Sequence, residues 1–363
     1  MTRLALEQVG FVYPDGTRAL DAVDLVVEPG ASVALIGQNG SGKSTLVRHL
    51  NGLLRPTEGR VLHDGVDTAE RRTAAMASVV GVAFQDPGRQ IFSRRIRDEV
   101  AFGPRILGHS KERVVASVAE ALELVGLTDV ADQNPYDVGY SRRKLLALAS
   151  VVAMETPVVV LDEPTTGQDA RGVRRVATLV ETLVTAGRTV IAVSHDMRFV
   201  AETFERVVVM QRGRVVLDGS VSEVFAEAAW PTLASSFIEP PVAARIGARL
   251  GLGSTPTERA FVDAEREHLV QLRETGRDQA QQLVGRIEVA QADEAGAQRV
   301  GDGLVELLLG DEAVIDHCLH HRFPGLRDLI NDFIDLVVLD DSLFDEDFED
   351  LLGIHEARDV GCE

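Results

Sequence analysis

The stretch Gly37-Gln38-Asn39-Gly40-Ser41-Gly42-Lys43-Ser44-Thr45 is the most informative part of this 363-residue chain. It follows a short apolar run, Val33–Ile36, and precedes an amphipathic segment that begins at Leu46. Strand, glycine-rich loop and helix in this order, with these spacings, form the phosphate-loop pattern. Glycines let consecutive backbone N–H groups point at one phosphate, and the helix adds its positive end. The stretch therefore predicts a nucleotide-binding fold in which Lys43 reaches the β- and γ-phosphates and the Ser44 hydroxyl is a ligand for Mg²⁺.

Length and composition limit the possible classes of protein. A chain of 363 residues is expected to form about two domains and to bury a real core. No apolar run approaches the roughly 18–20 residues of a membrane span, and the N-terminus has no signal-peptide pattern. The two cysteines, Cys318 and Cys362, are too few for a disulfide framework, which favours a reducing cytosol.

The charge is unevenly distributed along the chain. Residues 1–231 carry 26 basic and 29 acidic side chains, whereas residues 232–363 carry 11 and 28. This shift predicts a domain boundary near Trp230-Pro231. Because the acidic second part would repel phosphates, binding of nucleic acid is not expected.

Strand-like and helical patterns alternate along the first two thirds of the chain. Apolar runs predict strands at 4–12, 23–27, 33–36, 60–62, 79–84, 158–163, 189–193, 207–210 and 215–217. Apolar spacings of three and four residues predict helices at 112–125, 141–154 and 173–183. The alternation predicts a doubly wound α/β sheet with its ligand at the carboxyl ends of the strands.

Five side chains stand where a nucleotide site would use them. Asp162 and Glu163 end an apolar run, where one carboxylate can hold Mg²⁺ and the other can polarise the attacking water. His195 follows another apolar run and is expected near the γ-phosphate, whereas Gln85 offers an amide to the metal or the water. Tyr13 lies upstream of the loop, where an aromatic ring can stack on adenine. Each type of residue also occurs at such places for structural reasons, as caps of strand ends, loop residues or packing rings.

Taken together, these residues resemble, in order and spacing, the nucleotide-binding subunit of ABC transporters over roughly residues 1–226. The resemblance implies a P-loop NTPase core with antiparallel N-terminal strands and an ABC-type helical subdomain. It implies that ATP is bound by Tyr13 and by the Walker A residues Gly37, Gln38, Asn39, Gly40, Ser41, Gly42, Lys43, Ser44 and Thr45. It also implies that Ser44, Gln85 and Asp162 hold Mg²⁺, and that Glu163, His195 and Gln85 are catalytic. Thr166-Gly167-Gln168-Asp169 matches the D-loop of the family.

The segment Phe84–Pro104 narrows the resemblance. Its sequence resembles the energy-coupling-factor ATPases that drive uptake of vitamins, cobalt and nickel, in which this segment helps to form the groove for coupling helices of a membrane subunit. The resemblance implies three partners, namely a second ABC ATPase subunit, an integral-membrane coupling subunit and a substrate-binding membrane subunit. It also implies peripheral attachment to the cytoplasmic face of the cell membrane.

The chain departs from the family at the signature motif. Asp162 and Glu163 match the Walker B motif of the family and its catalytic glutamate. The positions about two dozen residues before them hold Val138-Gly139-Tyr140-Ser141-Arg142 in place of Leu-Ser-Gly-Gly-Gln. In the family this motif binds the γ-phosphate of the partner's site across a head-to-tail dimer. Tyr140 adds bulk where backbone has to approach a phosphate, and Ser141 offers only a displaced hydroxyl. A heterodimer whose partner brings a normal signature is therefore favoured over a homodimer that uses Ser141.

The C-terminal part is less informative. We predict an ATP-binding domain at 1–231 with a helical subdomain at about 86–156, a linker at 232–256 with a short helix at 242–250, and an acidic helical domain at 257–363. The cluster His317-Cys318-Leu319-His320-His321 has two interpretations, a metal site or a solvated cluster of histidines. Imidazole and thiolate suit transition metals, but no matching pair of ligands stands elsewhere.

Two functions are compatible with these patterns. The first is the ATPase subunit of an energy-coupling-factor importer that takes up a small substrate, a vitamin or a transition-metal ion. The alternative is an ATP-gated regulatory or interaction protein with slow hydrolysis and the C-terminal domain as its output. The altered signature and the unusual tail favour the second function, whereas the intact Glu163 and the segment Asp86–Pro104 favour the first.

Overall fold

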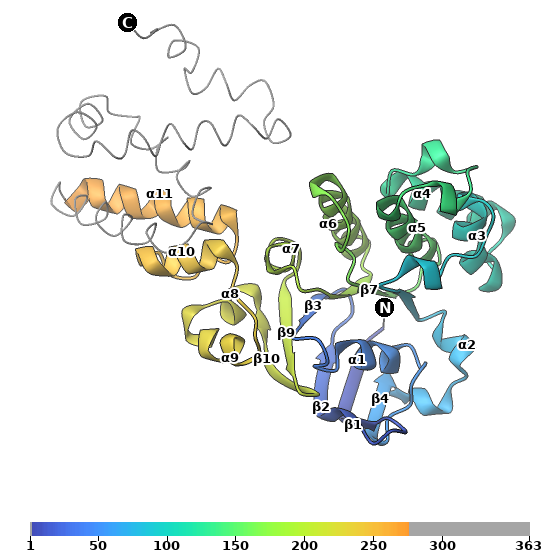
Figure 1. The fold of residues 1–363 in the computed structure, drawn as a ribbon, viewed down its shortest axis with the longest axis horizontal. Coiled ribbons are helices and arrows are strands. Elements are labelled where there is room, and N and C mark those ends of the chain that lie inside the picture. The colour runs from blue at the N-terminus through green and yellow to red at the C-terminus, as the bar shows by residue number, and fades with distance from the viewer. Residues whose placement is uncertain (1, 276–363) are drawn as a thin grey trace, which may run out of the picture. The chain divides into compact units, whose positions relative to one another are not determined.

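The computed structural model of the chain describes residues 2–275 (Figure 1). Its first compact unit comprises Met1–Ala248 and Gly253–Phe261, and Arg249–Leu252 and the residues from Val262 onward form a second. The first unit contains two sheets and a group of helices that together form the predicted α/β P-loop fold, which is confirmed. The second unit is described only over Arg249–Leu252 and as far as residue 275. The start of the helical domain predicted from residue 257 is described as the helix Glu258–Thr275, whereas the rest of that domain and the His317–His321 cluster lie outside the described residues.

The larger sheet has six strands. Their order is β10 (Arg214–Ser220), β9 (Arg206–Gln211), β3 (Ser32–Ile36), β8 (Thr189–Val193), β7 (Val158–Asp162) and β6 (Val80–Ala83). All neighbours are parallel except β10, which runs antiparallel to β9. The parallel strands are almost continuously apolar because both faces of the sheet are covered, as parallel sheets require. This continuity made them predictable from sequence.

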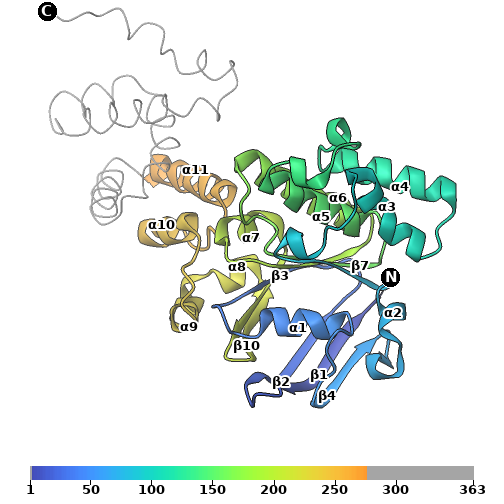
Figure 2. The ribbon, with the colours of Figure 1, turned by 45° about the vertical axis from the view of Figure 1, so that its right-hand side comes forward.

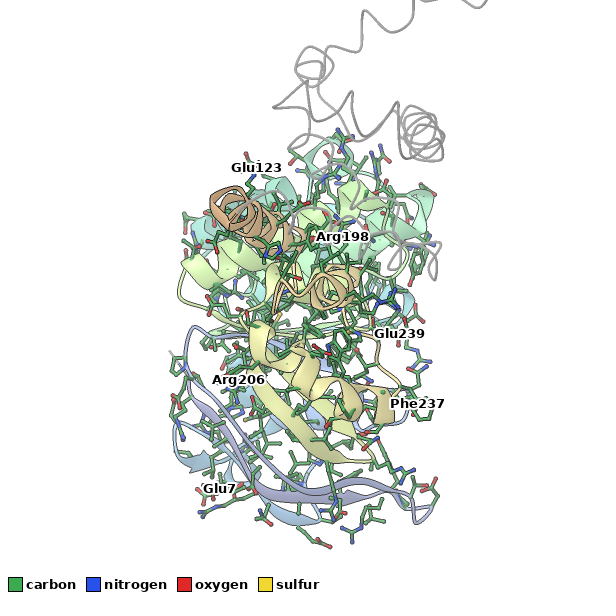
Figure 3. The ribbon with its side chains drawn as sticks, turned by 90° about the vertical axis from the view of Figure 1, so that its left-hand side faces the viewer. Glu7, Glu123, Arg198, Arg206, Phe237 and Glu239 are labelled. Atoms are coloured by element: carbon green, nitrogen blue, oxygen red, sulfur yellow. The ribbon has the colours of Figure 1, made fainter. Side chains whose placement is uncertain are left out.

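The smaller sheet is antiparallel. Its order is β2 (Arg18–Val27), β1 (Leu4–Val12), β4 (Glu58–His63) and β5 (Val66–Asp67). Arg206 on β9, which is labelled in Figure 3, links the two sheets. Its guanidinium donates to both carboxylate oxygens of Asp218 at 2.7 and 2.6 Å and to the main-chain oxygen of Val26 on β2 at 2.7 Å. The predicted antiparallel N-terminal strands are confirmed.

Two hydrophobic cores lie on opposite faces of the six-stranded sheet. One buries Leu35 and Val160 with the small sheet and with α1 (Lys43–Leu50), while the other buries Ala34 and Leu161 with the remaining helices. Alternate residues of each strand therefore face different cores, as the period of two requires. Figures 1 and 2 show α3, α4 and α5 gathered at one end of this unit, away from the small sheet.

The helices begin at capping residues in several places. Their bounds are α2 (Thr73–Met76), α3 (Ile96–Ile106), α4 (Lys111–Leu124), α5 (Tyr140–Val152), α6 (Ala170–Thr185), α7 (Met197–Thr203), α8 (Val221–Val224), α9 (Trp230–Ser235), α10 (Val242–Leu250) and α11 (Glu258–Thr275). Short 3-10 turns lie at Thr68–Glu70, Pro87–Arg89, Thr128–Val130, Pro135–Asp137 and Glu227–Ala229. The side chains of Ser110, Asp169 and Asp196 cap α4, α6 and α7. The three helices predicted in this region match α4, α5 and α6 with ends that differ by one to three residues.

Buried side chains continue beyond residue 231. Three of them belong to the core between the sheet and the helices: Leu233 on α9, Ile238 between α9 and α10, and Ala244 on α10, which are 0%, 7% and 2% exposed. The short helix predicted at 242–250 is confirmed as α10. The boundary at residue 231 stays a prediction, and a packing boundary near residue 261 competes with it. Within residues 2–275, no helix is both long and apolar enough to cross a membrane.

Candidate functional site

The carboxyl ends of neighbouring parallel strands bring the predicted site residues to one edge of the sheet. β3 leads into the phosphate loop, β7 ends at Asp162, and β8, which lies between them, leads to His195. β6, next to β7, leads to Gln85. Parallel strands place all these ends on the same side, which is where α/β proteins bind ligands.

The phosphate loop is curled so tightly that two of its glycines have no space for a side chain. A Cβ on Gly37 would lie 2.3 Å from the main-chain oxygen of Met210, and one on Gly42 would lie 2.6 Å from that of Ala19. Gly37, Gly40 and Gly42 have φ angles of 149°, 80° and 105°, which glycine adopts without strain. Gly42 is also the N-cap of α1 and leaves the first N–H groups of that helix without a side-chain cap.

Lys43 is folded back under this loop. Its Nζ donates to the main-chain oxygens of Gly37 at 2.6 Å and Gln38 at 2.9 Å. Burial lowers the pKa of Lys43, and the nearby Glu163 and Asp162 oppose this effect. Gln38, Asn39 and Ser44 are exposed, whereas Ser41 and Thr45 are buried. The loop therefore presents main-chain groups and one ammonium together, which is the arrangement that a phosphate needs.

Tyr13 follows β1 and lies against the first turn of α1. Its hydroxyl is 3.1 Å from Thr45 Oγ1, and its ring meets Phe11 edge to face with centroids 4.9 Å apart. Phe11 in turn meets His49 in the same way at 4.8 Å. The half-buried Tyr13 ring is thus held next to the phosphate loop, while its stacking on adenine stays a prediction.

The two acids at the end of β7, Asp162 and the following Glu163, have different surroundings. Glu163 has a φ of 51°, an uncommon conformation for a residue with a side chain, and its N–H donates to the main-chain oxygen of Val193 at 2.9 Å. Strained backbone of this kind is concentrated at functional sites. Burial raises the pKa of Asp162, and the neighbouring Glu163 raises it further, while Lys144, Arg48 and Lys43 lower it. A cation bound beside Asp162 would stabilise its ionised carboxylate and so oppose the rise in its pKa.

Glu163 and His195 face each other. His195 Nδ1 lies 2.7 Å from Glu163 Oε2, but the contact lacks the geometry of a hydrogen bond, so this buried oxygen has no hydrogen-bond partner among residues 2–275. The Glu163 side chain is 11% exposed and the His195 side chain 71% exposed. A buried acceptor beside an exposed imidazole can hold a water molecule that hydrogen-bonds to both groups and enters from solvent.

The residues that the sequence suggests for Mg²⁺ fit that ion in kind. Ser44 offers a hydroxyl, Asp162 a carboxylate and Gln85 an amide oxygen, and oxygen ligands are what Mg²⁺ prefers. Ser44 and Gln85 are exposed and Asp162 is half-buried at the same edge of the sheet. Their assignment as ligands stays a prediction. Within residues 2–275, no group of three or more His, Cys, Asp or Glu side chains forms a separate metal site.

Sequence reasoning missed Lys144 on α5. Its side chain is 1% exposed, and its Nζ donates to the main-chain oxygens of Phe84, Gln85 and Asp162. Burial lowers the pKa of Lys144 to about 8, although the nearby Asp162 and Glu163 raise it. The signal available in the sequence was the last basic residue of the run Arg142-Arg143-Lys144 before an apolar stretch, which the sequence alone does not distinguish from an exposed lysine.

The signature-equivalent segment is bound to the D-loop of its own chain. The Ser141 hydroxyl donates to Gln168 Oε1 at 2.8 Å, and Gln168 Nε2 donates to the Ser141 main-chain oxygen at 3.2 Å. The Tyr140 ring lies so close to Gly167 that a Cβ there would be 2.7 Å from it. Asp169 is engaged too, because its carboxylate accepts from Gly172 N and caps α6.

The rest of that segment has structural partners. Val138 is buried, Gly139 is the N-cap of α5, and Arg142 lies 3.7 Å from the carboxylate of Asp129. Tyr140 is 42% exposed. The segment therefore presents an aromatic ring and the uncapped end of α5, and its serine hydroxyl is already used within the chain.

An exposed apolar edge lies on the predicted helical subdomain. It consists of Phe92, Phe102 and Ile106, which are 60%, 45% and 71% exposed, and the two phenylalanine rings meet edge to face at 4.7 Å. Glu99 holds the loop in place, since its carboxylate accepts from the N–H groups of Phe92 and Ser93 at 3.1 and 2.7 Å. We call these three apolar residues the aromatic edge. Exposed apolar clusters of this kind mark interaction surfaces.

Comparison with known proteins gives three kinds of match. A family model described as "ABC transporter" matches residues 20–166. A putative ABC transporter ATP-binding protein of Caldanaerobacter subterraneus is 40% identical over 68% of the chain, and one of Pyrococcus furiosus is 41% identical over 61% of it. An energy-coupling factor transporter ATP-binding protein of Symbiobacterium thermophilum is 44% identical over 62% of the chain.

The matches differ in how much of each relative they cover. The chain covers 85% of the Pyrococcus protein and 81% of the Symbiobacterium protein, but only 43% of the Caldanaerobacter protein and 39% of a Methanosarcina acetivorans relative. Among solved structures, cbiO1 of Clostridium perfringens, described as part of the ABC transporter complex cbiONQ, is 34% identical with a TM-score of 0.57. That match covers 64% of this chain and 94% of the other. A dimeric ATP-binding cassette bound to ADP and phosphate is 25% identical with a TM-score of 0.56, over 60% of this chain and 98% of the other.

Proposed function

The chain belongs to the ABC transporter family of ATP-binding proteins, and from this premise we propose that it is the ATP-hydrolysing subunit of an energy-coupling-factor importer. Its cargo would be a small substrate, a vitamin or a transition-metal ion. One observation carries the proposal: neighbouring parallel strands bring the Lys43 loop, the acids Asp162 and Glu163, and His195 to one edge of the sheet. The Symbiobacterium relative, an energy-coupling factor transporter ATP-binding protein, supports the choice of importer.

The residues would divide the chemistry as follows. The phosphate loop and Lys43 bind and orient the phosphates of ATP, and Tyr13 stacks on the adenine. Mg²⁺ bound to ATP would neutralise charge on the transferred phosphoryl group, and Ser44, Asp162 and Gln85 are the residues to hold it. Glu163 accepts a proton from the attacking water, for which its unpartnered buried oxygen is available. His195, 2.7 Å away, orients that water toward the γ-phosphate.

The aromatic edge is the proposed contact with a membrane subunit. Its three apolar side chains are exposed, and Glu99 fixes the loop that carries one of them. Docking there would hold the protein at the cytoplasmic face of the cell membrane, together with a substrate-binding membrane subunit. Movements at Gln85, a few residues before Phe92 in the chain, would then reach the membrane partner directly.

The proposed second ATPase subunit differs from this chain. A signature motif serves the ATP bound by the partner, and here the Ser141 hydroxyl is engaged with Gln168 while Tyr140 covers Gly167. A heterodimer in which the partner supplies a normal signature to the site of Lys43 and Glu163 would hydrolyse ATP at that site and slowly at the other. In a homodimer, each of the two intact Walker sites would face an altered signature, so both sites would hydrolyse ATP slowly.

The alternative is an ATP-gated regulatory protein, and the signature-equivalent segment is the observation that favours it. In that case the chain would bind ATP and dimerise but hydrolyse it slowly. The aromatic edge favours transport, because a regulator has no need of a membrane docking surface.

Co-purification of the chain from its native membranes distinguishes the two functions. The importer predicts that multispanning membrane proteins co-purify, and that Phe102→Ala weakens their retention. Leu53→Ala, which removes a 51% exposed apolar side chain elsewhere, is the matched control and should leave it unchanged. Recovery of the chain without any membrane protein, or equal effects of the two variants, would contradict the importer.

A further inference from the structure

Lys144 is a fully buried cation with no role in the proposed chemistry. It lies near the start of α5, two residues after the signature-equivalent segment, and is 1% exposed. Lysine is almost never this buried unless its charge is paired or hydrogen-bonded, because removing an ammonium from water is costly. A leucine or methionine would fill the same space without that cost. The presence of an ammonium at this buried position therefore indicates that its hydrogen bonds have a role.

The hydrogen bonds of Lys144 show what the ammonium holds together. Its Nζ lies 3.2 Å from the main-chain oxygen of Phe84, 2.5 Å from that of Gln85 and 3.1 Å from that of Asp162. An ammonium has three N–H donors, and these three carbonyls use all of them. Two of the carbonyls follow the end of β6, and the third belongs to the last residue of β7.

Two of these residues, Gln85 and Asp162, are proposed ligands of Mg²⁺. Lys144 binds their main chains rather than their side chains, so both side chains are left available. A side chain can point only where its main chain allows, and the ammonium fixes both main chains to one point. The separation and direction of the two side chains therefore depend on Lys144.

A second contact from α5 supports the same segment. Gln90 Nε2 donates to the main-chain oxygen of Ala147 at 2.9 Å, and Gln90 Oε1 accepts from Phe84 N at 3.2 Å. The segment that carries Gln85 is thus attached to α5 at both of its ends. Of these attachments, only that of Lys144 also reaches β7.

We propose that Lys144 is a positioning residue that sets the relative placement of Gln85 and Asp162 for the metal of the bound nucleotide. The inference rests on the ATP site proposed above and adds to it a residue that touches neither nucleotide nor metal. Some groups orient the ligands of a metal by hydrogen bonds without touching the metal, and their removal typically lowers metal affinity by about 10- to 100-fold. Because Lys144 does not touch the phosphates, its removal should leave metal-free binding of ATP unchanged.

The test measures binding of a fluorescent ATP analogue to the full chain, first with a chelator and then in a titration with Mg²⁺. Lys144→Met removes the ammonium and keeps the length of the side chain. It should leave affinity in the chelator within about twofold of the unmodified chain and raise the Mg²⁺ concentration for half-maximal tightening by about 10-fold or more. Lys144→Arg, which keeps the charge and the donors, should restore much of the difference. If Lys144→Met does not fold, Lys144→Gln, which removes the charge, replaces it with the same expected results.

The matched control is Ser150→Ala on the same helix, whose hydroxyl donates only to the main-chain oxygen of Leu146. It should change neither measurement. An unshifted Mg²⁺ midpoint in the variant that lacks the ammonium would overturn the inference, and so would equal weakening of binding with and without Mg²⁺, which indicates a purely structural role. If the unmodified chain bound ATP without any response to Mg²⁺, the proposed metal-dependent site itself would be wrong.

Discussion

Replacing Gly37 by alanine should destabilise the protein far more than the same replacement at Gly40, three residues along the phosphate loop. Both glycines have positive φ angles, 149° and 80°, so alanine is strained at either position. The space around them differs. A Cβ on Gly37 would lie 2.3 Å from the main-chain oxygen of Met210 and 2.8 Å from Ser41 Oγ, whereas no atom of the described part of the chain lies within 4 Å of a Cβ on Gly40.

The two costs can be estimated from these surroundings. A left-handed conformation costs a residue with a side chain about 1–2 kcal/mol, which is the whole loss expected for Gly40→Ala. Met210 lies on β9, which is paired with β3, so its carbonyl cannot move aside without distorting the sheet. Overpacking of this kind adds about 1–3 kcal/mol, which gives about 2–5 kcal/mol for Gly37→Ala.

Urea unfolding of both variants, followed by circular dichroism without nucleotide, measures the difference directly. Omitting nucleotide ensures that a loss of ligand binding does not contribute to the apparent stability. Gly37→Ala should unfold at a clearly lower urea concentration than Gly40→Ala. Equal free energies of unfolding for the two variants would refute the close packing of the loop against β9.

Three further predictions concern the site, the buried histidines and the domain boundary. Lys43→Ala should weaken binding of a fluorescent ATP analogue by at least about tenfold, since it removes a charged donor, whereas Lys111→Ala at the exposed start of α4 should not; equal affinities would contradict the phosphate loop. Burial lowers the pKa of His49 and of His63 below 6.5, so the unfolded chain takes up more protons below that pH. The free energy of unfolding should therefore fall by up to about 1.4 kcal/mol per pH unit for each histidine as the pH drops below 6.5. Urea titrations at several pH values should show that the free energy of unfolding of His49→Gln depends less steeply on pH than that of the unmodified chain; an equal dependence would contradict this. A chain that ends after Phe261 should be more stable to urea than one that ends after Ser236, because the shorter chain loses the buried Ile238, Ala244 and Ile246; equal stability would favour the boundary at residue 231.

The parts of the fold that could be predicted are those with a strong local signal. The parallel strands are continuous apolar runs, and the phosphate loop combines glycines with Lys43 at fixed spacing, so both were evident from sequence. α3 was not predicted, because it contains Gly103-Pro104, a pair that argues against a helix interior. The charge shift near residue 231 reports composition, whereas the burial of Leu233 and Ala244 depends on packing that no local pattern reveals.

The candidate site shows the same division. Asp162, Glu163 and His195 could be placed because each follows an apolar strand. The roles of Lys144 and Gln168 could not, because each depends on contacts between segments distant in sequence. Ser141 illustrates the point: its sequence position suggested an available hydroxyl, and the structure shows it donating to Gln168 of the same chain.

The most direct test of the proposed function is the rate of ATP hydrolysis by the complete complex with Glu163→Gln in this chain, compared with the equivalent glutamate change in its partner ATPase. Glutamine keeps the shape of Glu163 but cannot accept the proton, so ATP should still bind while turnover at this site falls about 10²-fold or more. The partner's change should matter much less, because this chain serves the partner's ATP with an altered signature. Equal losses from the two changes would contradict the heterodimer, and unchanged turnover with Glu163→Gln would contradict the central claim that this chain hydrolyses ATP with Glu163 as its base.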